Sequence, residues 1–134
     1  MPLMKMDHEN DPKQELLNSF SEVVKNISLA GPSVLVAVYK RPLKTQKGLI
    51  LTENYRDEDI YQGKIGLILK MGSYPFDEED KKFFGDKRPE VGDWVMFRVS
   101  DGMSLVLGNR EGHCRLFSDR RTLKMFLGEP DLVW

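Results

Sequence analysis

The sequence predicts an all-β domain, a small barrel or sandwich, preceded by one amphipathic helix. Three observations support this fold class. Short apolar runs of strand composition recur from residue 33 onward, glycine-containing turns separate them, and the alternation of strand and helix that builds a parallel sheet is missing. At 134 residues the chain fits one domain and has enough apolar residues to bury a core without metals or disulfides.

The first 32 residues are expected to form an arm and a helix. Residues 1–10 are polar and show no period, so they predict an arm. Asp11 can cap a helix, Pro12 suits its first position, and Gln14 stands where a capping-box residue would reach back. Apolar residues then recur at three- and four-residue spacing until Gly31 and Pro32 stop the helix; they are Leu16, Leu17, Phe20, Val23, Val24 and Ile27.

The apolar stripe of this helix packs either on the body of the same subunit or on another chain. We favour the same subunit, because an amphipathic helix most simply covers its own domain. Residues 33–134 are then expected to form the β domain, interrupted by two long connections at about 42–62 and 72–90.

Strand patterns follow the helix. Residues 34–39 are apolar at nearly every position, which predicts a strand buried on both faces. Residues 64–70 form a second expected strand, in which Gly66 predicts a bulge or a bend at a barrel corner. Asp101 and Gly102 are a strong hairpin signal. Further strands are expected at 94–99, 103–107 and 113–117, and residues 122–127 fit either a strand or one helical turn.

The two long connections differ in character. The first carries Gly48, Leu49, Ile50 and Leu51 between polar stretches. A loop of this length is uncommon unless it is functional or disordered, and three exposed aliphatic residues need a partner to cover them. The alternative is that Leu49 to Leu51 form an ordinary buried strand. The second connection contains the acidic residues 77–80, which are most simply a solvated face.

Composition restricts the function classes. A net charge of −1 argues against a general nucleic-acid binder, which usually carries a basic excess. With neither a signal peptide nor an apolar run long enough to span a membrane, the sequence predicts no membrane partner and a cytoplasmic protein. One cysteine, Cys114, excludes an intrachain disulfide.

Chemical constellations are scarce, so neither an enzyme, a metal site nor a cofactor is expected. His113 and Cys114 are adjacent, so in a strand they point to opposite faces and cannot form a dyad. Asp119, Arg120 and Arg121 are expected in a solvated turn; the alternative is that they pair with an anion together with Arg115.

Four segments occur in a familiar order. They are Val-Leu-Val-Ala-Val at 34–38, Gly-Leu-Ile-Leu-Thr at 48–52, Gly-Lys-Ile-Gly-Leu-Ile-Leu at 63–69 and Val-Gly-Asp-Trp-Val-Met-Phe at 91–97. In this order and spacing they resemble the GroES co-chaperonin family, chaperonin-10, and cover about half of the chain. The last segment is similar to that family's Val-Gly-Asp-x-Val-hydrophobic-Phe.

The resemblance implies an irregular GroES-like β-barrel with the helix added in front of it. It also implies a non-enzymatic chaperone: a seven-membered ring that caps a GroEL-type chaperonin and encloses a chamber for protein folding. In that family the aliphatic triplet of a mobile loop docks into the chaperonin. This role carries over to Leu49, Ile50 and Leu51, and Gly48 matches the glycine that precedes the triplet.

The added helix and the longer second connection look like those of divergent co-chaperonins encoded by bacteriophages, which act in the host cytoplasm. The same additions also fit a phage virion protein, such as a capsid cement or head-to-tail element. Such a protein would use a GroES-like barrel and grip neighbouring capsid proteins with its helix.

Overall fold

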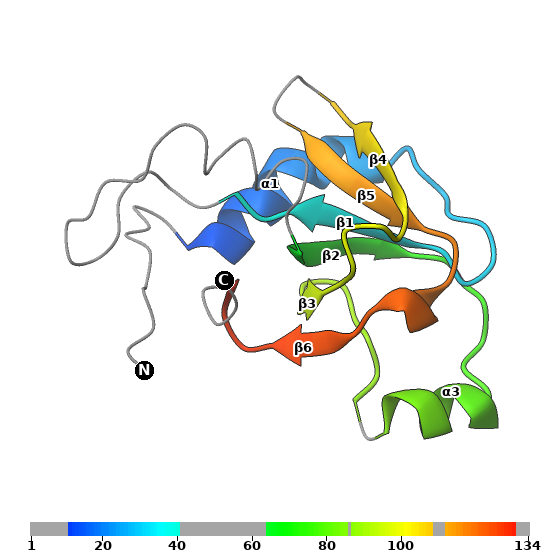
Figure 1. The fold of residues 1–134 in the computed structure, drawn as a ribbon. Helices are drawn as coiled ribbons and strands as arrows, with labels where there is room; N and C mark the ends of the chain where they lie inside the picture. The colour runs from blue at the N-terminus through cyan, green and yellow to red at the C-terminus, as the bar shows by residue number, and fades with distance from the viewer. Residues whose placement is uncertain (1–10, 41–63, 86, 109–111, 131–134) are drawn as a thin grey trace, which may run out of the picture.

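The computed structural model describes residues 11–40, 64–85, 87–108 and 112–130 (Figure 1). The helices are α1 (Pro12–Val24), α3 (Glu78–Phe84) and a single 3₁₀ turn, η1 (Arg120–Thr122). The strands are β1 (Val34–Val38), β2 (Ile65–Met71), β3 (Trp94–Met96), β4 (Met103–Val106), β5 (His113–Phe117) and β6 (Met125–Leu127).

The strands form one antiparallel sheet in the order β4-β5-β1-β2-β3-β6. Strands β4 and β6 are its two edges, and no pairing joins them within the described residues, so the sheet is open (Figure 1). The predicted all-β fold and the predicted barrel are therefore wrong. The fold is mixed α/β, two helices with a six-stranded open sheet.

Helix α1 explains why the sheet need not close. It lies across one face of the sheet, and Phe20 packs there with Leu35, Ala37, Leu69 and Cys114. The other face has its own core, so both faces lose contact with water without barrel closure. That second core consists of Val34, Val36, Ile68, Val95, Phe97, Phe117 and Leu123.

Two expectations for α1 are confirmed. The helix begins at Pro12, and the Asp11 side chain accepts a hydrogen bond from the Lys13 amide at 3.3 Å. Its apolar stripe packs on the sheet of the same chain. The expected capping box is wrong, because the side chain of Gln14 donates instead to Asn18 along the helix, at 3.0 Å.

The central strands agree with the sequence except at Gly66. All of β1 is buried, as predicted. The register of β1 against β2 shifts between Leu35 and Val36, so the irregularity falls opposite Leu69 rather than at Gly66. Gly66 is needed for another reason: a Cβ there would lie 2.6 Å from the carbonyl oxygen of Ala37 and overlap the Val36 side chain.

The chain after β2 differs most from expectation. The second connection was predicted as a loop, but it contains α3, which begins at the N-cap Asp77. Residues 122–127 were predicted to form either a strand or one helical turn. The structure has a part of each, because Thr122 ends η1 and Met125–Leu127 form β6. In the described parts of the chain, no helix has the length and apolar composition needed to cross a membrane.

Candidate functional site

The predicted binding residues Gly48, Leu49, Ile50 and Leu51 lie outside the described residues. The structure does describe the two points between which they are inserted. The amide of Tyr39, just after β1, donates to the carbonyl oxygen of Ile65 in β2 at 2.9 Å. Because β1 and β2 are antiparallel neighbours at the centre of the sheet, residues 41–63 join two points that are one hydrogen bond apart.

This base of the 41–63 segment is well packed. Tyr39 and Trp94 meet edge to face, with 5.5 Å between their ring centroids. Ile65 and Leu67 complete the buried cluster, and Leu16 of α1 packs against it. The segment is therefore inserted into a part of the sheet that is buried and stabilised by an aromatic contact. Scaffolds of this kind position binding loops in many proteins.

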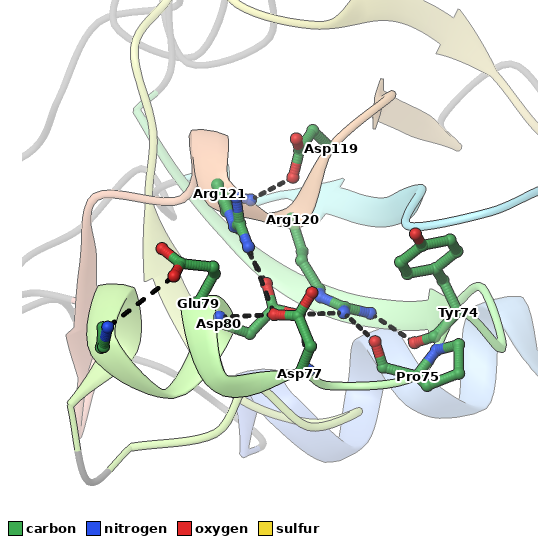
Figure 2. Close-up of polar contacts among 9 residues, drawn as sticks. Tyr74, Pro75, Asp77, Glu79, Asp80, Asp119, Arg120 and Arg121 are labelled. Atoms are coloured by element: carbon green, nitrogen blue, oxygen red, sulfur yellow. Dashed lines mark hydrogen bonds and ion pairs between the residues drawn. The ribbon is translucent and has the colours of Figure 1, made fainter.

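A second feature is a buried charge cluster between α3 and η1 (Figure 2). The guanidinium of Arg120 donates through Nη1 to the carbonyl oxygen of Tyr74 at 2.7 Å, and through Nη2 to that of Pro75 at 2.8 Å. Nη2 also donates to Oδ2 of Asp80 at 2.7 Å. Arg120 is 1 % exposed and Asp80 is 3 % exposed, so the pair is almost completely removed from water.

Local capping places these side chains. Asp77 Oδ1 accepts from the Asp80 amide at 2.9 Å, and Asp80 Oδ2 accepts from the Asp77 amide at 3.2 Å, which makes a reciprocal capping box for α3. On the other side, Asp119 caps η1 by accepting from the Arg121 amide at 2.9 Å. Arg121 Nε then donates to Oδ1 of Asp80 at 2.9 Å, so both oxygens of Asp80 are paired (Figure 2).

An aromatic ring completes the cluster. The guanidinium carbon of Arg120 lies 3.8 Å from the centroid of the Phe76 ring, and that of Arg88 lies 4.1 Å from the same centroid. Arg120 therefore combines an ion pair, two carbonyl contacts and a cation–π contact.

The electrostatics of the cluster identify it as a stable ion pair. The hydrogen bond from Arg120 is the main cause that holds the pKa of Asp80 well below its usual range; burial opposes it, and bonds from the Asp77 amide and Arg121 add to it. Asp80 in turn raises the pKa of Arg121. Asp80 is thus ionised at neutral pH, a state suited to holding α3 in place.

The predictions made from the sequence for these residues are corrected by the structure. The acidic run was expected to be a solvated face, and Asp119 to Arg121 a solvated turn, yet Asp80 and Arg120 are buried against each other. Arg115, the alternative anion partner, lies elsewhere and donates to the carbonyl oxygens of Val99 and Asp101. The capping-box spacing of Asp77 and Asp80 was the available signal for α3.

The remaining candidate groups are also placed. Cys114 is buried beneath α1, and burial raises the pKa of its thiol to about 12, so it is protonated at neutral pH. Within the described ranges, no group of three or more His, Cys, Asp or Glu side chains could hold a metal ion.

The chain matches no protein-family model and no curated protein. Two features remain on which to base a functional proposal. The base of the 41–63 segment can present that segment from a rigid sheet, and the Arg120 cluster ties α3 to the rest of the fold.

Proposed function

We propose that the protein is a co-chaperonin, which caps a GroEL-type chaperonin through Gly48, Leu49, Ile50 and Leu51 and so assists protein folding. The observation that carries the proposal is the hydrogen bond between Tyr39 and Ile65 at the base of the segment that holds these residues. A binding segment that starts and ends at one point of a buried sheet can dock without any change in the sheet.

The energetics favour a reversible cap. Burying three aliphatic side chains contributes roughly 1.5–3 kcal/mol each, before the cost of ordering the segment and docking it. One copy therefore binds weakly. Several copies in one ring bind together through multivalency and still release. Self-association into a ring is part of the proposal, and the resemblance to the GroES family suggests seven copies.

The proposal does not depend on a closed barrel. It requires a rigid base for the binding segment and a means of self-association, and an open sheet offers both. Edge strands carry unpaired backbone groups that can pair with another chain. We assign the contacts between copies to the edges formed by β4 and β6.

Packing of α1 bears on the second candidate, a structural protein of a phage virion. In that role the helix would grip a neighbouring capsid protein through its apolar stripe. Phe20 and the partly buried Leu17 and Val24 instead pack against the sheet of their own chain. This arrangement favours an accessory role for α1 and supports the co-chaperonin proposal, with the cytoplasm, or the host cytoplasm for a phage-encoded protein, as its location.

The decisive experiment measures binding of the full chain to a bacterial GroEL-type chaperonin with adenine nucleotide, by size-exclusion chromatography with light scattering. The wild-type protein and Ile50→Leu should co-elute with the chaperonin. Ile50→Asp should not, because its charge would enter an apolar groove. Failure of the wild type to bind, or equal binding by Ile50→Asp, would refute the proposal. Stoichiometric presence of the chain in purified phage particles, together with such failure, would favour the virion role.

A further inference from the structure

The segment at residues 72–85, here called the strap, runs from the end of β2 through α3 and lies beside η1 and β6 (Figure 1). Its burial is unusual. Asp80 is the only one of its residues that is fully buried, while Tyr74 and Phe83 are 54 % and 52 % exposed. A segment with few buried apolar contacts has low local stability, because its docking does not share the main hydrophobic core.

Arg120 supplies three of the hydrogen bonds that hold the strap down, while Arg121 pairs with Asp80 and Asp77 and the Gly72 amide donates to the Ser33 carbonyl. Its guanidinium bonds the carbonyl oxygens of Tyr74 and Pro75 and the carboxylate of Asp80, and it lies against the Phe76 ring. Four positions along the strap thus depend on one side chain from η1. Apolar support includes the contact of Phe84 with Phe126, with 6.2 Å between the ring centroids.

The closed state also contains an unpaired donor. Arg120 Nε is buried and has no hydrogen-bond partner among the described residues. Such a group is costly, and opening of the strap would return it to water. Opening also leaves no charge stranded, because Arg120 and Asp80 are both solvated when they separate. Replacing Arg120 while the strap stays closed does leave a charge without its main partner. Asp80 then remains buried with Arg121 as its remaining cation.

We propose that the strap opens as a unit from an otherwise folded sheet, and that Arg120 is the lock that holds it closed. Opening uncovers Phe126 of β6, which packs against the sheet core, together with the strap's own Phe76 and Phe84. The device therefore switches an aromatic surface between covered and uncovered states. This proposal is argued from the contacts of Arg120 and is independent of the co-chaperonin proposal.

Hydrogen exchange of the full chain, measured by NMR at several low denaturant concentrations, tests the proposal. In α3, the amides of Lys81 and Gly85 bond the carbonyls of Asp77 and Lys81. In the sheet region, the amides of Ile68 and Phe97 serve as references, bonded to the carbonyls of Asp93 and Lys64. The α3 amides should exchange faster than the references in the wild type, with little dependence on denaturant, as expected for local opening.

The variant Arg120→Met should accelerate exchange of the α3 amides on the order of 10- to 100-fold and leave the references unchanged, because hydrogen bonds to a charged group are lost. The matched control is Arg98→Met, whose side chain is 67 % exposed, and it should change neither set. Asp80→Asn should give a smaller acceleration, since Arg120 keeps its carbonyl and ring contacts, and it preserves the test if Arg120→Met does not fold.

Two results would overturn the proposal. The first is a wild-type protein in which α3 and reference amides share one denaturant dependence, which would make the strap part of a single cooperative unit. The second is unchanged exchange of the α3 amides in both Arg120→Met and Asp80→Asn, which would show that Arg120 is not the lock.

Discussion

Arg120 and Asp80 are 40 residues apart in the chain, yet their side chains form a 2.7 Å ion pair that is nearly inaccessible to water. A buried ion pair is a poor source of net stability, because desolvation of both charges offsets most of their attraction. It is more effective in fixing geometry, since few alternative positions satisfy both partners. The pair thus determines where α3 lies, and removing the charge of one partner still destabilises the fold, because the other charge is left buried without its partner.

The first prediction concerns acid. Asp80 has its pKa lowered by the bond from Arg120, so its contribution to stability is fully present above the unfolded value of about 3.9. That contribution is lost as the pH falls from about 4 through the lower folded value. Urea unfolding at pH 7, 5, 4, 3 and 2 should show the free-energy difference between wild type and Asp80→Asn to be constant from pH 7 to 5 and to shrink below pH 4. A constant difference down to pH 2 would contradict this assignment.

The second prediction concerns the contact of α1 with the sheet. Phe20 is 5 % exposed and packs against Leu35 and Cys114. Phe20→Ala should lower the free energy of unfolding by about 3–5 kcal/mol, the usual cost of deleting a buried aromatic side chain. The adjacent Ser21 is exposed, so Ser21→Ala should stay within about 0.5 kcal/mol of wild type. Denaturant titrations of both variants measure the two costs, and equal effects would show that α1 is not packed as described.

The third prediction uses Cys114 as a reporter. Burial raises the pKa of its thiol to about 12, so the thiolate that reacts with a disulfide reagent is scarce in the folded protein. At pH 8 the folded protein should label far more slowly than the urea-unfolded chain, and Phe20→Ala should label faster than wild type. Equal labelling of folded and unfolded protein would place Cys114 at the surface.

The fourth prediction concerns a close approach of backbone. Gly66→Ala would set its methyl group against the carbonyl oxygen of Ala37 and the side chain of Val36, so the central strands must shift apart. The expected loss is about 1–3 kcal/mol, as for other overpacked cores. Gly128→Ala is the control, because an added Cβ there meets nothing within 4 Å. Thermal unfolding should separate the two variants clearly, and a stable Gly66→Ala would argue against the register of β1 and β2.

Local patterns in the sequence predicted most elements of this fold. The stripe that begins at Leu16 identified α1, although the helix ends at Val24 and not at the predicted stop before Gly31. The apolar runs identified β1 and β2, because each signal depends on neighbouring residues. The turn at Asp101 and Gly102 likewise separated β3 from β4. Closure of the sheet was not predictable in this way, since strand composition does not specify whether the outermost strands meet.

The candidate site was harder to predict. A run such as that of Asp77 to Asp80 is usually solvated, and only a partner far along the chain can make burial of one member acceptable. That partner, Arg120, looked equally solvated in its own turn. Neither position reveals the other, because the pairing depends on how η1 and α3 meet in space. The proposed binding residues Gly48 to Leu51 lie outside the described residues and stay a prediction.

The hydrogen bond between Tyr39 and Ile65 has a consequence for the evolution of this protein. This bond fixes the distance between the two described points that residues 41–63 connect. Each doubling of a connection's length costs only about 0.6 kcal/mol in closure entropy. A change in the length of this connection therefore costs little closure entropy. Evolution can therefore vary the length of this segment at little entropic cost. The same property makes the position between β1 and β2 a suitable place to graft a foreign recognition sequence.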